Sequence, residues 1–339
     1  MTGVLAGPGL EFELVADGAE LVHRFDSMAS TITVRIPART ADPRAAVLEV
    51  VDAFSRIATS CTRFDPDSEL MQANAAGDRW FAVGPACLAV IEAAQQAYLE
   101  TGGRFDPRVL TALRAHGYDR TFADLPADVE LVRGADQPPG EPGSATLVGP
   151  PARERWRPGL HRQPPQVRIG DQPIDLGGIG KGMALRWAVH RLREHADRFL
   201  IEAGGDCYLS GSGPDGGPWL VAVEDPHGGA EPVAVLAIED AAVATSSTRR
   251  RRWRAGGRSV HHLIDPATGQ PGGAGLAAVT VVGPDPARAE VWAKVLFLAG
   301  AEGIATAAAD AGLAALWVSE AGPIGVSAGL AGQLRWVAG

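Results

Sequence analysis

Apolar and polar residues in the first hundred positions follow two periods, one typical of strands and one typical of helices. Thr31–Ile36 alternates and is rich in β-branched residues, which predicts a strand. Ala45–Thr59 carries its apolar residues at helical spacing, which predicts an amphipathic helix. Pro85–Gly102 predicts a second helix, because proline is favoured in a first turn and glycine just after a last one. The chain is therefore expected to open with a strand followed by two helices.

The second half of the chain predicts further strands and two more helices. A glycine-rich turn and a helix are expected over Ile174–Ala196, and another helix over Pro286–Leu298. Short apolar, β-branched runs predict strands at Phe199–Glu202, Trp219–Glu224, Val233–Ile238, Ala277–Val282 and Ala315–Val318. This order of elements agrees with an α+β fold but does not by itself select one.

One long segment between these halves has no apolar periodicity. Gly134–Pro165 is rich in proline, glycine and arginine, a composition typical of a surface excursion. A chain of 339 residues can form one elaborated domain or two coupled ones. We interpret the segment as an insertion within a single domain and not as a domain boundary.

The net charge and the cysteine content argue against several classes of protein. The formal net charge of -9 argues against a nucleic-acid-binding protein, because such proteins neutralise phosphates with clustered basic residues. Cys61, Cys87 and Cys207 form no C-x-x-C pair, which argues against a zinc site and favours a reducing compartment. The first residues lack the pattern of a signal peptide, and no run of about 18 apolar residues occurs. We therefore expect a cytoplasmic protein with no membrane partner, unless the sequence is a trimmed one.

The segment with the most informative chemistry is Ile174–Gly182, which reads IDLGGIGKG directly before a helical pattern. Closely spaced glycines let the backbone approach a ligand, and a helix N-terminus offers unpaired N–H groups with partial positive charge. Lys181 adds a full charge, so the segment predicts a cradle for an anion. It matches neither G-x-x-x-x-G-K-[ST] nor G-x-G-x-x-G. The alternative interpretation is a tight turn that closes a strand–helix unit.

This segment and six other blocks resemble, in the same order, those of the ApbE family of FAD:protein FMN transferases. The other blocks are Asp26–Ser30, Phe64–Leu70 with Asn74, Gly103–Pro107, Glu202–Asp206, Ala244–Ser247 and His262–Gly269. The resemblance implies an α+β, ApbE-like and T-fold-related fold with a mixed sheet core, surrounding helices and two interleaved subdomains around a flavin cleft. It further implies one domain over residues 20–339, preceded by an extension over residues 1–19.

The resemblance also implies an activity and a site. FMN would pass from FAD to a threonine or serine hydroxyl of a partner flavoprotein, and AMP would leave. FAD is implied to contact Met28, Phe64, Arg104, Phe105, Asp106, Asp175, Lys181, Ile264 and Lys294. His262 is the implied catalytic residue, because an imidazole with an ordinary pKa of about 6.5 suits the activation of a weak hydroxyl nucleophile. If this segment is extended, His261 points to the opposite face and does not reach the ligand.

Each of these residues also has a structural interpretation. Met28, Phe64 and Ile264 are of types that usually belong to a core, and His262 is in that case a hydrogen-bonded structural histidine. Asp106 and Asp265 each precede a proline, where a carboxylate often caps a turn.

One block departs from the family pattern at the implied Mg²⁺ site. The family's A-D-A-x-x-T helix motif reads Ala289–Lys294 here, which places the implied metal positions at Gly180, Glu290 and Ala293. The Glu290 carboxylate can still bind a hard cation, whereas the Lys294 ammonium has no acceptor atom. One alternative is a surface ion pair between Glu290 and Lys294 at i,i+4. The other is that the Lys294 ammonium takes the place of the metal and contacts the diphosphate.

Two further departures bear on ligand binding. Arg108 replaces the threonine usual after the F-D-P motif, and the arginine run Arg249–Arg252 follows the T-S-S block. Such a run is usually a solvated face, but here it could hold the adenylate phosphate or an acidic acceptor.

Three functions remain open from the sequence. They are FMN transfer to a protein, FAD binding without metal-dependent transfer, and hydrolysis of FAD to FMN and AMP by a pyrophosphatase. The altered metal motif favours binding alone, and the presence of His262 favours transfer.

Overall fold

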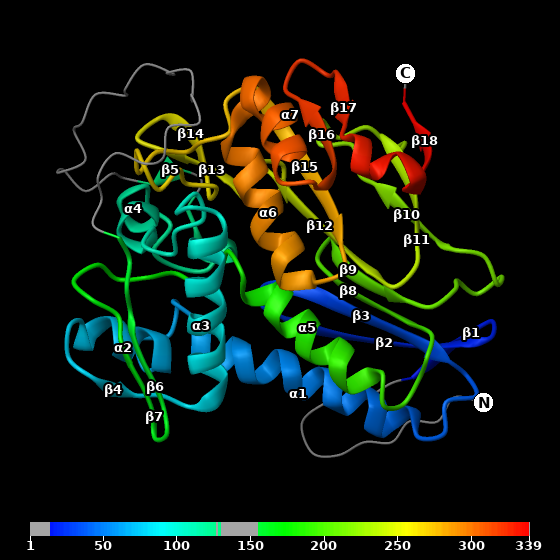
Figure 1. Cartoon of the computed structure of the whole chain (residues 1–339), viewed down its shortest axis with the longest axis horizontal. Coiled ribbons are helices and arrows are strands. Elements are labelled where there is room, and N and C mark those ends of the chain that lie inside the picture. Colours follow the sequence, from blue (N-terminus) through cyan, green and yellow to red (C-terminus); the bar gives the residue numbers. More distant parts are fainter. Residues whose placement is uncertain (1–13, 127, 130–154, 339) are drawn as a thin grey trace.

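A nine-stranded sheet forms the centre of the computed structural model, which describes residues 14–126, 128–129 and 155–338 (Figure 1). Its strand order is β1-β2-β3-β8-β9-β12-β15-β16-β17. The strands are β1 (Val15–Asp17), β2 (Glu20–Ser27), β3 (Ser30–Pro37), β8 (Phe199–Ala203), β9 (Asp206–Ser210), β12 (Ala241–Ser247), β15 (Leu276–Gly283), β16 (Ala314–Ser319) and β17 (Ile324–Val326). β1 pairs with β2, so part of the extension expected over residues 1–19 belongs to the sheet.

The strand directions refine the expected sheet. Every neighbouring pair in the nine-stranded sheet is antiparallel, where the family resemblance implied a mixed sheet. For the pairs β2–β3, β8–β9 and β16–β17 the physical reason is that a tight turn joins the two strands, and a tight turn reverses the chain. A parallel pairing joins β5 (Asp128–Val129) to β13 (Arg252–Ala255) in a small sheet completed by β14 (Arg258–His261).

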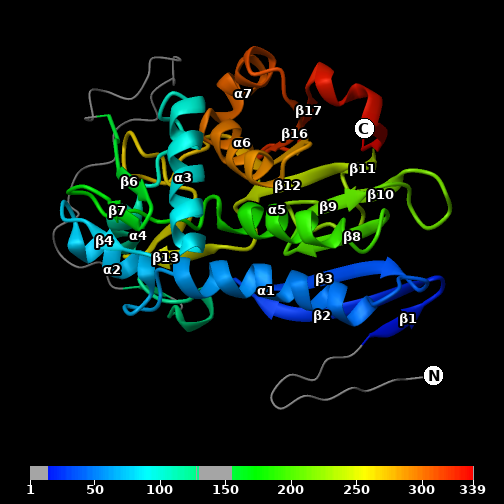
Figure 2. The same cartoon turned by 60° about the horizontal axis from the view of Figure 1, so that its bottom comes forward.

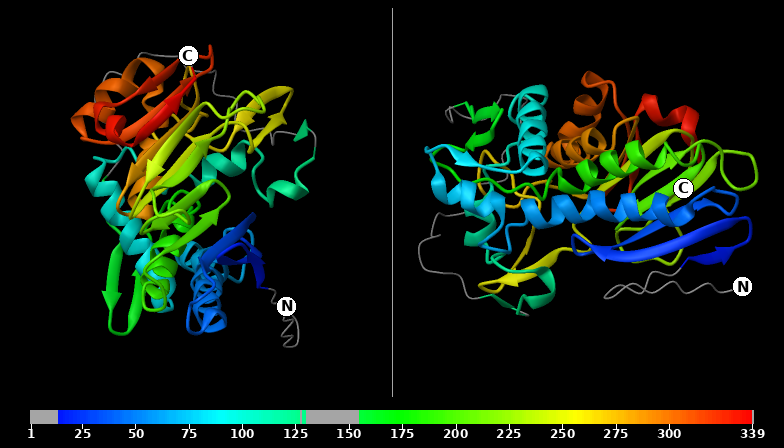
Figure 3. Two further views of the ribbon diagram at one scale, coloured as in Figure 1. Left: turned by 90° about the vertical axis from the view of Figure 1, so that its right-hand side faces the viewer. Right: turned by 90° about the horizontal axis from the view of Figure 1, so that it is seen from below.

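Three helices cover one face of the large sheet. They are α1 (Pro43–Cys61), α5 (Gly180–Leu192) and α6 (Pro286–Leu298), and α5 packs against both of the others. Figure 2 and the right panel of Figure 3 show α1 running alongside β2 and β3. The remaining helices are α2 (Glu69–Ala76), α3 (Pro85–Glu100), α4 (Leu110–Ala115) and α7 (Gly300–Asp310), with 3₁₀ turns at Phe122–Asp124 and Ala328–Gln333. Within the described part of the chain, none of the helices combines the length and apolarity needed to cross a bilayer.

A three-stranded sheet covers the opposite face near the C-terminus. It consists of β10 (Trp219–Val223), β11 (Ala234–Ile238) and β18 (Leu334–Val337). Trp219 and Leu236 pack there with Val243 and Leu316 of the large sheet in a second apolar core. The middle of the nine-stranded sheet is therefore buried on both faces, which explains why strands such as β9 and β15 are almost wholly buried.

The part of the predicted insertion that the structure describes belongs to the fold. Residues 155–165 lead into β6 (Gly159–Arg162) and β7 (Pro165–Arg168), which pair with each other, and β7 also pairs with β4 (Phe81–Ala82). Trp156 is buried, and its Nε1–H donates to the Ile169 carbonyl at 3.3 Å. The sequence did not predict this buried anchor, because one tryptophan carries no periodic signal, whereas residues 161–164 at the hairpin tip are exposed. Residues 134–154 lie outside the described residues.

Candidate functional site

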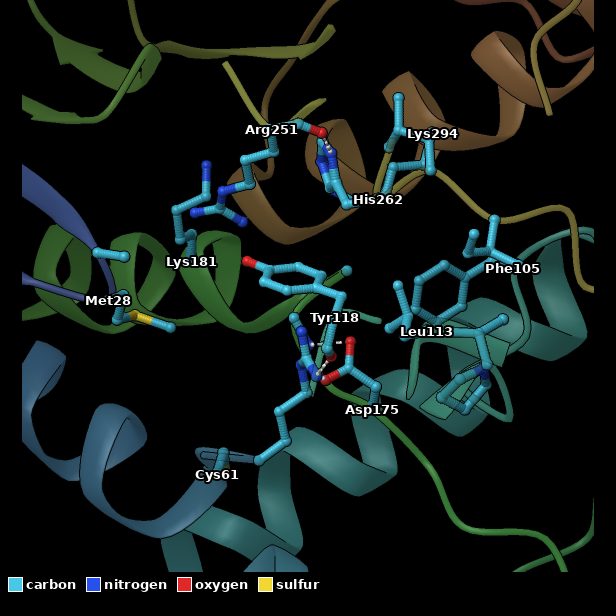
Figure 4. Close-up of a pocket in the computed structure, with 18 of the residues that line it drawn as sticks. Met28, Cys61, Phe105, Leu113, Tyr118, Asp175, Lys181, Arg251, His262 and Lys294 are labelled. Carbon is cyan, nitrogen blue, oxygen red and sulfur yellow. Dashed lines mark hydrogen bonds and ion pairs between the residues drawn. The ribbon is translucent and has the colours of Figure 1, made fainter. Parts of the chain in front are cut away.

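Two adjoining cavities meet beside the first turn of α5. The first has a volume of about 390 Å³ and mainly apolar walls, and the second, of about 900 Å³, adjoins β12 and the arginine run. Four cationic or titratable side chains line both cavities, and we call this group the junction: Lys181, Arg251, His262 and Lys294. Figure 4 shows Arg251, His262 and Lys294 along one side of the first cavity, opposite Asp175 and Cys61. Three cations and one imidazole are thus shared by the two cavities at the place where they join.

The structure brings most of the predicted site residues to the first cavity. All nine residues predicted to contact FAD line it, together with His262. Their contacts with FAD stay predictions. Of the three predicted metal positions, Glu290 lines the second cavity, whereas Gly180 and Ala293 are buried and line neither.

A strained turn carries Met28 to the cavity. Met28 and Ala29 connect β2 to β3 with φ of 53° and 56°, the left-handed region that favours glycine. The Met28 side chain then lies against the start of α5, where a Cβ built on Gly180 would stand 3.1 Å from Met28 Cε. The glycine at position 180 is therefore explained by close packing against Met28.

Sequence reasoning missed an arginine that organises the cavity wall. The Arg63 guanidinium lies 4.2 Å from the Phe64 ring centroid and 4.1 Å from that of Tyr118, and it donates to the Tyr118 carbonyl. Arg63 Nε is 3.4 Å from Asp175 Oδ1. The sequence feature that could have indicated Arg63 is its position directly before Phe64, the first residue of the family-like block Phe64–Leu70. Arg63 thus joins the aromatic wall to the glycine-rich segment.

Asp175 and Asn74 fix that glycine-rich segment in place. Asn74 accepts from the Ile174 N–H and donates to the Ile174 carbonyl, both at 2.9 Å. Burial raises the pKa of the Asp175 carboxyl, and the Arg63 cation and the Gly177 N–H at 3.2 Å oppose that rise. These contacts show that the segment depends on side chains about one hundred positions earlier in the sequence.

Asp106 and Asp265, which each precede a proline, cap turns with their carboxylates, as the structural interpretation of these two residues predicted. Asp106 accepts from the Arg108 N–H at 2.9 Å and forms a largely buried ion pair with its guanidinium. Asp265 accepts from the Ala267 N–H at 2.8 Å. Both carboxylates therefore have partners within the protein, although Asp106 also lines the first cavity.

At the junction, Lys181 is paired. Its ammonium contacts the Asp206 carboxylate, which is buried at the start of β9 and also accepts from the Thr245 N–H at 2.9 Å. The β8–β9 turn, from the G-G-D block, thus supplies the counter-ion of Lys181.

His262 faces the cavities as a neutral imidazole. Burial lowers its pKa well below the ordinary value, and the neighbouring Arg251 and Lys294 cations add to that shift. Its Nδ1 lies 3.4 Å from the Arg251 carbonyl, so a proton on Nδ1 leaves the Nε2 lone pair free to accept. His261 is the last residue of β14 and lies outside both cavities, with its ring edge-on to Phe297, so one of the two histidines lines them.

The arginine run divides into two roles. Arg249 and Arg250 line the second cavity only, and they form solvent-exposed ion pairs with Glu224 at 3.4 and 3.1 Å. Arg251 instead lines both cavities. Three arginines of the run therefore border the second cavity, and Arg251 alone of the three also reaches the first.

Glu290 and Lys294 form a pair inside the protein, so the interpretation as a surface ion pair is wrong. Glu290 is 2% exposed; its Oε1 lies 3.1 Å from Lys294 Nζ, and its Oε2 accepts from the Gly182 N–H at 2.8 Å. The sequence pattern of α6 could not reveal this burial, because a charged residue is normally expected on the exposed side of a helix. Glu290 is buried because α5 packs against α6.

These contacts do not fit a Mg²⁺ site. Both Glu290 oxygens are already occupied by hydrogen-bond donors, and the ammonium of Lys294 stands where the family has a hydroxyl ligand. Among residues 14–126, 128–129 and 155–338, no cluster of three or more His, Cys, Asp or Glu side chains is placed to hold a metal ion.

The fold is shared with solved structures. The chain superimposes on the ApbE protein of Thermotoga maritima with a TM-score of 0.77 at 24% identity, covering 94% of this chain and all of the other. The flavin transferase ApbE of Vibrio cholerae gives a TM-score of 0.71 at 21% identity over 93% and 99% of the two chains. These similarities confirm the predicted α+β, ApbE-like fold.

Sequence comparison agrees. A protein named FAD:protein FMN transferase from Klebsiella pneumoniae is 28% identical over 291 residues, 82% of this chain and 77% of the relative. A relative of the same name from Treponema pallidum is 28% identical over 79% of this chain and 75% of its own length. The model of the ApbE family matches residues 28–317. This chain therefore belongs to the ApbE family.

Proposed function

We propose that this protein is an FAD:protein FMN transferase that moves FMN from FAD to a threonine or serine hydroxyl of an acceptor protein. Family membership and the names of the curated relatives support the reaction class. The observation that carries the proposal within this chain is the neutral His262 imidazole among three cations at the junction of two cavities. That arrangement offers a base and an anion site at one place.

The two cavities suggest how FAD is divided. We assign the isoalloxazine ring to the first cavity, where Met28, Phe64, Phe105 and Ile264 offer apolar and aromatic surface. The diphosphate would then lie at the junction, against Lys181, Arg251 and Lys294. The larger second cavity leaves room for the AMP half and for the approach of the acceptor.

His262 supplies the base. The acceptor oxygen attacks the flavin-side phosphorus and gives its proton to Nε2 as the new P–O bond forms. The bond from that phosphorus to the bridging oxygen breaks, and AMP leaves with that oxygen. The cations at the junction stabilise the charge that collects on the diphosphate during this exchange. Protonated His262 then returns the proton to solvent or to the leaving phosphate.

Incubation with FAD and a threonine-containing acceptor peptide, followed by intact-mass measurement, tests the proposal. We expect the peptide to gain the mass of FMN less water, with one AMP released for each peptide modified. Removal of the base in a His262→Gln variant should slow this transfer by about 10²–10⁴-fold. FAD affinity should change little, because a neutral side chain of similar size remains.

Two outcomes would contradict the proposal. Release of FMN and AMP with no modified peptide would indicate a pyrophosphatase. Tight retention of FAD with neither product would indicate a binding protein. Transfer at an unaltered rate in the His262→Gln variant would leave the reaction class intact and remove His262 from its assigned role.

A further inference from the structure

The lysines of this chain are confined to the junction. Of its 31 basic residues, Lys181 and Lys294 are the only two lysines, and all the others are arginines. Both lysines line both cavities. A compact ammonium on a flexible stem is therefore present only here, although the sequence otherwise uses the planar guanidinium.

The Lys294 ammonium is held in place from α6 and α5 together. Nζ lies 3.1 Å from Glu290 Oε1 and 3.4 Å from the Glu290 carbonyl, one turn earlier on α6. The other oxygen of Glu290 is fixed by the Gly182 N–H in the first turn of α5. Gly182 packs directly on α6, since a Cβ there would lie 2.5 Å from Ala287 Cα. The position of the charge is thus set by the packing of two helices.

This geometry excludes a second cation beside Glu290. A divalent ion on its carboxylate would displace the Gly182 N–H or Lys294, and the freed ammonium would then face a dication a few ångströms away. The nearby Asp206 carboxylate is engaged as well, by Lys181 and by the Thr245 N–H. The two carboxylates that contact the junction lysines, Glu290 and Asp206, are therefore both already engaged by a lysine and by a backbone N–H.

We propose that the Lys294 ammonium, anchored by Glu290, takes the place of a divalent cation at the diphosphate of FAD, so that this chain binds FAD without metal. The identity of the ligand rests on the proposed function. The side chain of Lys294 is 18% exposed, so the ammonium reaches the cavities while Glu290 stays buried behind it. A charge-assisted hydrogen bond to a phosphate oxygen needs one exposed proton of the three that an ammonium carries.

Titration of the protein with FAD in EDTA and then in Mg²⁺ tests this directly. We expect the dissociation constants in the two solutions to agree within about twofold, whereas a metal-dependent site would lose about tenfold or more in EDTA. A loss of that size for the wild-type protein would overturn the proposal.

Charge removal gives a second measurement. Lys294→Met keeps the length of the side chain and should weaken FAD binding in EDTA by about tenfold or more, because a charge-assisted bond is lost. Arg288→Met is the matched control: it removes a positive charge from the same helix at an exposed ion pair with Glu100, and should change the affinity by less than about twofold. Equal effects of the two variants would contradict the specific role of Lys294.

Restoring the family's residue types should restore the metal requirement. The double variant Glu290→Asp with Lys294→Thr supplies the carboxylate and hydroxyl of the A-D-A-x-x-T motif. We expect it to bind FAD weakly in EDTA and more tightly when Mg²⁺ is added. An unchanged response to Mg²⁺ in a variant that retains the wild-type circular dichroism spectrum counts against the proposal.

The two lysines also permit a measurement on the unaltered protein. Selective ¹⁵N-lysine labelling gives side-chain signals from Lys181 and Lys294 only, and a Lys294→Arg variant assigns them. FAD added in EDTA should shift the Lys294 signal, and a signal that stays unmoved at saturation would overturn the proposal. Metal-free binding without FMN transfer would refute the proposed function alone, and transfer that requires Mg²⁺ for FAD binding would refute this inference alone.

Discussion

Histidines 261 and 262 are both held in the neutral form, mainly by burial and in addition by neighbouring cations. Burial lowers the pKa of His261 to about 4, and its Nδ1 accepts from the Leu263 N–H at 3.3 Å. His262 is held neutral by burial and by two neighbouring cations. Proton uptake by either ring is therefore easier in the unfolded chain, whose histidines have a pKa of about 6.5. The resulting stability is present above that pH and is lost as the pH falls below it.

This linkage predicts a pH-dependent stability. Between about pH 6.5 and pH 4, the free energy of unfolding should fall by up to about 1.4 kcal/mol per pH unit for each of the two histidines. Urea denaturation over this range measures the slope. A His261→Asn variant keeps an acceptor but does not titrate, so its slope should be shallower. Identical slopes for the variant and the wild type would contradict the assignment.

The contact between α5 and α6 is the element on which the junction depends. Gly182 N–H donates to Glu290, and the helix backbones meet at Gly182 and Ala287. The close approach brings the first turn of α5, with Lys181, next to the face of α6 that carries Lys294. Glycine is required here because of space, and not because of a left-handed backbone.

A Gly182→Ala substitution tests this contact. The added Cβ would lie 2.5 Å from Ala287 Cα and 2.7 Å from the Pro286 carbonyl, so the helices must separate. We expect a loss of stability of about 1–3 kcal/mol, measured by chemical denaturation, together with weaker FAD binding. Gly332→Ala is the control, since no atom lies within 4 Å of its Cβ position, and should be close to neutral. Equal stabilities of the two variants would show that the helices can separate freely.

On the scale of the whole molecule, the large sheet carries two cores on opposite faces, and the site opens at the edge of one of them. The segment that follows the undescribed residues 130–154 returns to the first core through Trp156. Its backbone N–H donates to the Tyr98 hydroxyl at 3.2 Å, and its indole packs edge-on to the Tyr98 ring. The β6–β7 hairpin is thus attached to α3.

Truncation of this anchor should destabilise the molecule globally. We expect Trp156→Ala to lower the free energy of unfolding by about 3–5 kcal/mol, the usual range for a buried tryptophan. Arg157→Ala offers a comparison, because Arg157 follows Trp156 directly in the chain but is exposed. Thermal unfolding followed by circular dichroism measures both. A change below about 1 kcal/mol for Trp156→Ala would mean that this segment is a surface appendage after all.

The sequence by itself determined much of the order of elements, the family resemblance and ten of the residues that line the first cavity. Periodicity identified α1 and α3, which bury one side against the rest of the molecule, and an apolar run identified α6, which is buried almost all round. It did not identify β9 or β12, since strands buried on both faces do not alternate. The ordered glycine-rich and histidine-containing blocks predicted a shared site, because backbone shape and ligand chemistry restrict residues locally.

Only the tertiary structure decided how the charges are paired. The partners Arg63 with Asp175, Lys181 with Asp206, and Glu290 with the Gly182 N–H are separated by 112, 25 and 108 positions. Burial of Glu290 likewise results from the packing of α5 against α6 and not from the composition of α6 alone. Local residue types specify which charges exist, whereas long-range packing determines which of them meet and which remain available to a ligand.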